Sequence, residues 1–300
     1  MSVVSAKRPK SYRDRFGLHK LMILPAAALF TVFFAVPFLQ GIYMAFTNWN
    51  GFARMDFIGL ENFRFFLGDD RARSAIGNTL LYGVLGTLTL NLTALMIAVY
   101  LDSLSHGAGV LRTVLYFPTI ISPLIMGFIW KFILSSENGV ILDTLTRIGV
   151  PYLYQDWLGN PAQARIVIPL VYVWQNVGGG VIIYLAGLQS IDHQMIESAE
   201  IDGANGFQTF WRVKFPLLTP SLRINVITSI IGTISIFDIV VSLTNGGPGY
   251  STESLSQFIY RQSTTGQAGY AAAVSMAMMV IIMIPVCAAF ILMRRMYMEN

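Results

Sequence analysis

Few side chains of this sequence could act as catalytic or metal-binding groups. The three histidines, His19, His106 and His193, lie outside the long apolar stretches, and Cys287 is the only cysteine. The sequence has no H-E-x-x-H zinc motif and no G-x-x-x-x-G-K-[ST] loop, whose backbone amides and lysine would bind nucleotide phosphates. A lone cysteine also excludes an internal disulfide and a cysteine metal centre. We therefore expect no catalytic site, no metal and no cofactor bound by this chain.

Polar side chains inside the apolar stretches are candidates of a different kind. Asp238 is the only acidic residue in such a stretch, and an ionisable group inside a membrane helix indicates function unless a neighbouring helix pairs with it. Amide and aromatic side chains can hydrogen-bond to a polar solute and stack on it. The candidates for a solute path are Asp238, Asn176, Trp174, Tyr184 and Asn225. Hydrogen bonding between helices is the alternative role for each of them.

The longest polar interruption, residues 192–220, holds the signals of a short helix that ends in a sharp turn. Asp192 is a good N-cap for a helix from His193. Ala199 and Gly203 lie four residues apart, so they stack on one face that offers almost no side chain. Glycine readily adopts the left-handed conformation of a helix end, so Gly203 is expected to make the turn.

A second short helix is predicted after this turn. Asn205 followed by Gln208 fits a capping box, and aromatic residues follow at helical spacing. Pro216 is expected to stop the helix. The expected unit of two helices could dock a partner, or it could lie flat on a membrane as an amphipathic linker.

Six apolar stretches must position these candidates. The chain is 54% hydrophobic and 12% charged, whereas an average soluble domain carries roughly 25% charged residues. Each stretch has an apolar core near the roughly 20 residues that cross a bilayer as a helix, and continuous apolar runs do not alternate as barrel strands do. We predict an all-α membrane protein with one domain, residues 21–293, and spans at about 21–47, 75–101, 110–133, 166–191, 221–244 and 268–293.

The distribution of basic residues predicts the orientation, because Lys and Arg are enriched in cytoplasmic loops. The segments 1–20, 102–112, 192–223 and 294–300 hold twelve basic and seven acidic residues, and the opposite loops hold eight of each. We therefore predict that the basic N-terminal segment 1–20, the loop 192–220 and the tail 294–300 are all cytoplasmic. The basic N-terminus is expected to anchor on the membrane surface rather than to bind nucleic acid.

The loop resembles the EAA signature of ABC-importer permeases. In that signature, Glu-Ala-Ala is followed by a glycine four residues later, then by nine residues and Ile-x-Leu-Pro. The matching residues here are Glu197, Ser198, Ala199, Gly203, Val213, Phe215 and Pro216. Ser198, Val213 and Phe215 depart from the signature, each with a residue of similar size or hydrophobicity.

The resemblance extends over nearly all of the chain. "FTNWNG" from Phe46, "FIGLENFRFFL" from Phe57 and "SLTNGGPGYSTESL" from Ser242 are similar to external segments of the carbohydrate-uptake branch. The branch includes the maltose and glycerol-3-phosphate systems, and the match is to the first permease of a heterodimeric pair.

This resemblance implies a permease subunit, not an enzyme, that moves a sugar or related carbohydrate across the cytoplasmic or inner membrane of a bacterium or archaeon. The implied partners are a second permease, two ABC ATPases that carry ATP and Mg²⁺, an external solute-binding protein and the lipid bilayer, with no nucleic acid. Closing of the ATPases would pull the loop and rock the bundle. The residues implied in this coupling are Glu197, Ser198, Ala199, Asp202, Gly203, Ala204 and Pro216.

An ion-coupled secondary transporter is the rival hypothesis. Such a protein carries its own coupling-ion site, usually with more than one buried charge near interrupted helices. Only Asp238 qualifies in this sequence. Uptake that survives loss of the ATPases but collapses with the ion gradient would favour the rival.

Overall fold

A computed structural model describes residues 15–52, 55–104 and 106–298 of the chain. Within these ranges the regular structure is helical, and the only β-type pairing is an isolated bridge between Thr47 and Phe57. The all-α prediction is therefore confirmed. Residues 1–14 of the predicted N-terminal segment and residues 299–300 of the predicted tail lie outside the described residues.

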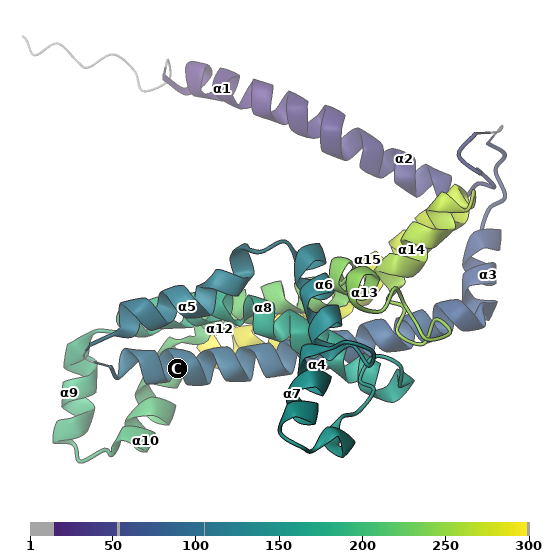
Figure 1. Cartoon of the computed structure of the whole chain (residues 1–300). Helices are drawn as coiled ribbons and strands as arrows, with labels where there is room; N and C mark the ends of the chain where they lie inside the picture. The colour runs from purple at the N-terminus through teal and green to yellow at the C-terminus, as the bar shows by residue number, and fades with distance from the viewer. Residues whose placement is uncertain (1–14, 53–54, 105, 299–300) are drawn as a thin grey trace, which may run out of the picture.

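The helices divide into a few long ones and many short ones (Figure 1). Two π-helical turns, Thr31–Ala35 and Phe210–Lys214, join α1 to α2 and α10 to α11, and a 3-10 turn, Pro151–Leu153, precedes α8. In chain order the α-helices are α1 Arg15–Phe30, α2 Val36–Met44, α3 Glu61–Gly68, α4 Asp70–Asp102, α5 Ala108–Ile120, α6 Pro123–Leu134, α7 Val140–Arg147, α8 Pro161–Gln189, α9 His193–Ile201, α10 Gly206–Thr209, α11 Phe215–Leu217, α12 Thr219–Ile234, α13 Asp238–Leu243, α14 Leu255–Thr264 and α15 Ala268–Met298.

The described helices include four that are long and apolar enough to cross a membrane, and two bent pairs raise the possible number to six. The four are Ile23–Met44, Asp70–Asp102, Pro161–Gln189 and Ala268–Arg294. The bent pairs are Ala108–Ile120 with Pro123–Leu134, and Gly206–Leu217 with Thr219–Ile234. Five of these segments overlap the predicted apolar stretches along most of their length, whereas the pair Gly206–Leu217 with Thr219–Ile234 overlaps the predicted stretch 221–244 only in its second helix.

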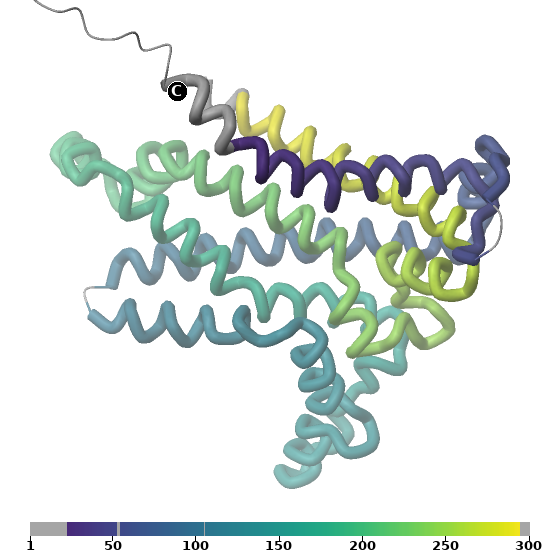
Figure 2. The backbone as a smooth tube through the Cα atoms, turned by 90° about the horizontal axis from the view of Figure 1, so that it is seen from above, coloured from purple at the N-terminus to yellow at the C-terminus, as the bar shows by residue number. Residues whose placement is uncertain are grey.

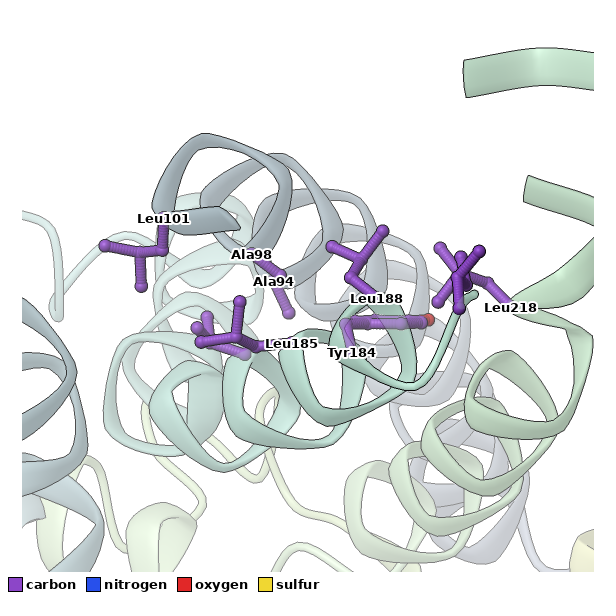
Figure 3. Packing of buried hydrophobic residues seen from close by; sticks show 9 residues of the cluster. Ala94, Ala98, Leu101, Tyr184, Leu185, Leu188 and Leu218 are labelled. Carbon is purple, nitrogen blue, oxygen red and sulfur yellow. The ribbon is translucent and has the colours of Figure 1, made fainter. Parts of the chain in front are cut away.

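The bundle core forms where α4, α8 and α12 pack side by side (Figure 2). At one end of this core, Ala94 and Ala98 of α4 face Tyr184 and Leu185 of α8, and Leu218 closes the group from the start of α12 (Figure 3). Because lipid tails are as apolar as leucine, membrane helices associate mainly through close packing and hydrogen bonds rather than through the hydrophobic effect. The small alanines let α4 approach α8 closely.

The predicted third span, 110–133, is broken by a 97° bend between α5 and α6. Pro123 lacks an N–H and disfavours helical conformation in the residue before it, and Ser122 is accordingly extended, with ψ of 132°. The freed carbonyl of Ile121 accepts a hydrogen bond from the Gln175 side chain at 2.7 Å. A neighbouring helix thus satisfies the backbone group that the break exposes.

The fifth apolar stretch also differs from the prediction of one span at 221–244. Helix α12 ends at Ile234, and after a short break α13 begins at Asp238. The carbonyl of Ile236 in this break accepts a hydrogen bond from the Ser254 hydroxyl at 2.7 Å. The second half of the stretch therefore packs as a separate short helix against α6.

The predicted helix stop at Pro216 is confirmed to within one residue. Helical structure continues through α11 to Leu217, and the chain then turns by 69° into α12. Proline fits the first turn of a helix because its missing N–H would have no intrahelical partner there. The π-helical turn Phe210–Lys214 resets the register just before it, so Pro216 occupies such a first-turn position.

Helices α1 and α2 leave the bundle and touch it mainly where α2 meets α15 (Figure 1). Within this first apolar stretch, no side chain between Ile23 and Met44 is buried in this chain. Its phenylalanines stack on one another instead, with ring centroids of Phe30 and Phe34 5.0 Å apart.

Candidate functional site

A cavity of about 260 Å³ opens between α4, α5, α8 and α12, and we call it the polar cavity. Most of the α8 residues that line the cavity are three or four positions apart, so a single face of that helix borders it. Amide and hydroxyl side chains provide its polar character. The lining residues are Leu90, Thr119, Tyr172, Asn176, Gly179, Gly180, Ile183, Asn225, Thr228 and Ser229.

Three consecutive glycines of α8, Gly178 to Gly180, lie beside the polar cavity and have two different roles. A Cβ on Gly178 would collide with the backbone carbonyl of Leu115 in α5, and a Cβ on Gly180 would lie 3.0 Å from the Cβ of Ala94 in α4. Around Gly179 there is no atom within 4 Å of such a Cβ, because this residue faces the cavity. The outer two glycines therefore allow close helix packing, and the middle one leaves space for a ligand.

Hydrogen bonds between helices fix the cavity wall. The Asn225 amide nitrogen donates to the Gly180 carbonyl at 3.0 Å, which ties α12 to α8. The Asn91 amide nitrogen donates to the Ser229 hydroxyl at 2.8 Å, and the Tyr184 hydroxyl donates to the Asn91 amide oxygen at 2.7 Å. This network is buried and joins α4, α8 and α12.

The structure brings together two of the five predicted solute-path residues. Asn176 and Asn225 both line the polar cavity. The Asn176 amide nitrogen donates to the Tyr172 carbonyl at 2.9 Å, which leaves its amide oxygen as an acceptor at the cavity.

The other three predicted residues lie elsewhere. Tyr184 is fully buried in the helix core (Figure 3), and its hydroxyl donates a hydrogen bond to the Asn91 amide oxygen. Trp174 lies two residues before Asn176, so it lies on nearly the opposite face of α8. Asp238 is exposed in the first turn of α13, where the helix dipole favours a carboxylate.

Several cavity residues were absent from the sequence prediction. Tyr172, Thr228 and Ser229 lie three or four residues from Asn176 or Asn225, so helical spacing alone could have found them. Thr119 comes from α5, and only the tertiary structure brings it to the cavity.

The second candidate region is the hairpin segment, residues 192–218, whose local geometry agrees with the sequence. The Asp192 carboxylate accepts a hydrogen bond from the Gln194 N–H at 3.0 Å and caps α9. Gly203 is left-handed, with φ of 83°. Asn205 and Gln208 exchange both hydrogen bonds of a capping box at 2.9 Å. The predicted caps and the predicted turn are therefore confirmed.

The hairpin segment projects beyond one end of the bundle and exposes both charge and aromatic surface (Figure 1). Glu197, Glu200 and Asp202 are exposed, and none of them forms an ion pair with another described residue. The Phe207 side chain is 74% exposed and meets Trp211 with ring centroids 6.2 Å apart.

One ion pair connects the hairpin segment to the bundle. The Lys214 ammonium lies 3.4 Å from a carboxylate oxygen of Asp102 at the end of α4. The ion pair therefore ties the hairpin segment to α4, the helix whose Leu90 lines the polar cavity.

At the opposite end of the bundle, a buried acidic group that the sequence prediction overlooked holds the loop before α14. The Glu253 carboxylate is about 1% exposed and accepts two hydrogen bonds from the Arg71 guanidinium, both at 2.7 Å. Arg261 lies 3.1 Å from the same carboxylate. Arg165 donates to the Ser251 carbonyl at 2.8 Å. Arginines from α4, α8 and α14 thus fix this loop on the bundle.

Comparison with protein families and curated proteins agrees with a transport role. Residues 92–297 match the family model described as "Binding-protein-dependent transport system inner membrane component". The chain is 34% identical to the multiple sugar-binding transport system permease protein MsmF of Streptococcus mutans. This match extends over 256 residues and covers 84% of this chain and 86% of the relative. It is 30% identical over 265 residues to the sn-glycerol-3-phosphate transport system permease protein UgpA of Agrobacterium fabrum, which covers 87% of this chain and 89% of the relative.

Comparison with solved structures gives the same result. A chain of a bacterial ABC transporter involved in the import of the acidic polysaccharide alginate superposes with a TM-score of 0.82 and 26% identity, over 94% of this chain and 96% of that one. A second structure shows a bacterial alginate ABC transporter in complex with an alginate pentasaccharide-bound periplasmic protein. It matches with the same TM-score of 0.82 and 25% identity, over 95% of this chain and 96% of that one.

Proposed function

The chain belongs to the family of binding-protein-dependent transport system inner membrane components, and we propose that it carries a neutral sugar through the polar cavity under the control of ATPases docked on the hairpin segment. As a member of this family, it is a multi-pass membrane permease subunit of an ABC importer and not an enzyme. The solute, the coupling residues and the orientation are the proposed parts.

The lining of the polar cavity supports a neutral, hydroxyl-rich solute. Asn176 and Asn225 supply amide groups, and Thr119, Thr228 and Ser229 supply hydroxyls. No Asp, Glu, Lys or Arg is among the residues that line this cavity. A phosphate or carboxylate group would therefore meet no opposite charge among these lining residues, whereas a sugar hydroxyl would find both donors and acceptors. A sugar is thus favoured over a glycerol phosphate or an acidic saccharide.

The exposed acidic surface of the hairpin segment supports docking of a protein rather than contact with lipid. Anionic headgroups attract basic segments, but α9 and its C-cap residue expose the carboxylates of Glu197, Glu200 and Asp202 to solvent. The bare face formed by Ala199 and Gly203 lets a partner approach the backbone. Ser198, Ala204 and Pro216 complete the proposed coupling set on the same short segment.

The proposed assembly contains a second permease, two ABC ATPases that hold ATP and Mg²⁺, and an external solute-binding protein. The hairpin segment would lie on the cytoplasmic side, with both termini. In Figure 2 the coloured part of α1 begins, and α15 runs, toward the end of the bundle that carries α9 and α10, which supports placing this end and the two termini on the same side. We place the assembly in the cytoplasmic or inner membrane of a bacterium or archaeon.

The coupling role is tested by Gly203→Val in the assembled transporter. A β-branched residue in the left-handed region is strained by roughly 1–2 kcal/mol or more, and no atom lies within 4 Å of a Cβ there. The change should therefore distort the turn without a steric clash. We expect less co-purified ATPase and slower uptake of a radiolabelled oligosaccharide.

Gly206→Val is the matched control, because Gly206 also has open space around a Cβ but has an ordinary negative φ. It should leave co-purification and uptake near normal. Normal co-purification and normal uptake in Gly203→Val would overturn the coupling role.

The rival ion-coupled mechanism has little support in this geometry. Asp238 lies outside the polar cavity and is exposed at the start of α13. Uptake in proteoliposomes should depend on ATP and persist when ionophores collapse the ion gradients, and the reverse result would restore the rival.

A further inference from the structure

One side chain reaches from α8 to α12 beside the polar cavity. Tyr172 of α8 lines this cavity, and the tip of its side chain lies against Gly232 of α12. A Cβ on Gly232 would collide with the Tyr172 hydroxyl and would lie 3.2 Å from the Tyr172 Cζ, and the three nearest atoms around such a Cβ all belong to Tyr172. Gly232 therefore provides the space that the tip of Tyr172 occupies.

This contact lies at the end of the polar cavity that is farther from the hairpin segment. Gly232 follows Thr228 and Ser229 by four and three residues, so the three share one face of α12, and Gly232 lies farther from the start of that helix. Tyr172 likewise comes one turn before Asn176 on α8. The Tyr172 side chain also packs against a buried apolar cluster from α4, α8 and α13. It thus separates the polar lining from apolar packing.

The Tyr172 hydroxyl differs from the hydroxyls of two buried tyrosines on the same core helices. Tyr82 donates to the Thr252 carbonyl at 2.9 Å, and Tyr184 donates to the Asn91 amide oxygen at 2.7 Å. The Tyr172 hydroxyl has no hydrogen-bond partner among the described residues, although tyrosine hydroxyls usually have one when buried. Tyr172 is only partly buried, and its hydroxyl is not among the enclosed polar atoms of the described chain. A solute can therefore reach it.

The chemistry of this side chain suits the proposed solute. A phenol hydroxyl both donates and accepts hydrogen bonds, as a sugar hydroxyl does. The polar cavity has a volume of about 260 Å³, whereas pockets for small molecules commonly measure roughly 300–1,000 Å³. In so small a space, a large side chain at one end decides how much of a solute fits.

We propose that Tyr172 is a specificity-determining residue that contacts the solute at this end of the polar cavity. Its hydroxyl donates a hydrogen bond to a sugar oxygen, and its ring limits the length of the saccharide that the cavity accepts. Gly232 leaves the room that this position of the hydroxyl requires. The inference rests on the proposed passage of a neutral sugar through the polar cavity.

Tyr172→Phe removes only the hydroxyl and so tests the hydrogen bond. The complete transporter in proteoliposomes, with excess solute-binding protein, is given radiolabelled glucose, maltose, maltotriose or raffinose, and the sugar that the wild type takes up fastest is followed. We expect about fivefold slower uptake, the effect of one net hydrogen bond. The melting temperature should stay the same, because no described residue binds the hydroxyl. Tyr100→Phe, whose 60% exposed side chain lies outside the polar cavity, is the matched control and should keep wild-type uptake.

Gly232→Ala tests the same hydroxyl from the other helix. The added methyl group meets the tip of Tyr172, which can rotate away, so the protein should fold while the hydroxyl is displaced. We expect about fivefold slower uptake from this change alone, and little further loss in a chain that already carries Tyr172→Phe, because both changes remove one interaction. Gly77→Ala in α4, where no atom lies within 4 Å of a Cβ, is the matched control and should transport normally.

Tyr172→Ala tests the limit on length. It removes the ring from the end of the polar cavity, so the uptake of trisaccharides relative to that of glucose and maltose should rise above the wild-type ratio. An unchanged ratio would overturn the limit on length.

Wild-type uptake by Tyr172→Phe would overturn the contact with the solute, and so would a loss of uptake that comes with a lower melting temperature. If Gly179→Leu, which obstructs the same cavity, still blocks uptake, the proposed function stands and only the role of Tyr172 fails. If Gly179→Leu also transports normally, or if the wild type takes up none of the four sugars, the polar cavity is not a sugar path and both fail.

Discussion

The hairpin segment and the polar cavity differ in the distance along the chain over which they are built. In the hairpin segment, each cap joins residues two or three positions apart, as with Asp192 and Gln194. In the polar cavity, the hydrogen bonds join residues that are far apart in the sequence, such as Asn91 and Ser229, which are 138 positions apart. A local unit can keep its shape when the bundle moves, whereas the cavity must change with the packing of its helices. This difference suits a rigid docking element that acts on a deformable path.

The largest expected effect comes from Gly178→Val in the cavity wall. The new side chain would collide with the backbone of α5, which a rotamer change cannot relieve. Overpacking typically costs about 1–3 kcal/mol and more where backbone is the obstacle. We expect a strong loss of monodisperse protein in size-exclusion chromatography. A normal yield and a normal melting temperature would show that α5 and α8 are not closely packed at Gly178 and that the cavity wall does not depend on this contact.

Gly179→Leu should have the next largest effect, on transport alone. Space is open at this position, so the protein should fold and bind ATPase normally. The leucine would project into the polar cavity and obstruct the solute. We expect uptake to fall by about tenfold or more, which corresponds to about 1.4 kcal/mol added to the transport barrier. Unchanged uptake in proteoliposomes would mean that the solute does not pass this wall.

Tyr184→Phe should give a smaller effect, on stability rather than on solute choice. It removes the donor to the buried Asn91 amide oxygen, at a cost of about 1 kcal/mol in a membrane core. We expect the melting temperature to drop by a few degrees, while the relative uptake of different sugars stays the same. Altered sugar selectivity would instead return Tyr184 to the solute path.

The smallest expected effect is that of Asn205→Ala in the hairpin segment. It removes the capping box with Gln208, and loss of an N-cap costs about 1 kcal/mol. ATPase affinity should fall by about fivefold or less, because only the local geometry weakens. The control is Asn205→Ser, which retains a capping oxygen and should restore the affinity. A loss of the folded membrane domain in the alanine variant would show that the segment is not an independent local unit.

The breaks in two of the predicted membrane spans could not be predicted from the sequence. The third apolar stretch contains Pro123, but its 97° bend depends on Gln175 of another helix, which receives the freed carbonyl of Ile121. The first helix of the fifth stretch ends at Ile234, and in the break that follows, the hydroxyl of the loop residue Ser254 donates to the carbonyl of Ile236. Hydropathy measures how apolar a stretch is, and it does not report which distant side chain satisfies a broken backbone.

The sequence by itself determined the membrane class, the position of the six apolar stretches and the caps and turn of the hairpin segment. Each of these depends on composition or on residues a few positions apart, where propensity and capping act directly. Only the tertiary structure decided that Asn176 and Asn225 share a cavity, while Trp174 faces a different one and Tyr184 is part of the core. The physical reason is that a helix carries polar residues on several faces, and the packing of its neighbours determines which face borders an open space.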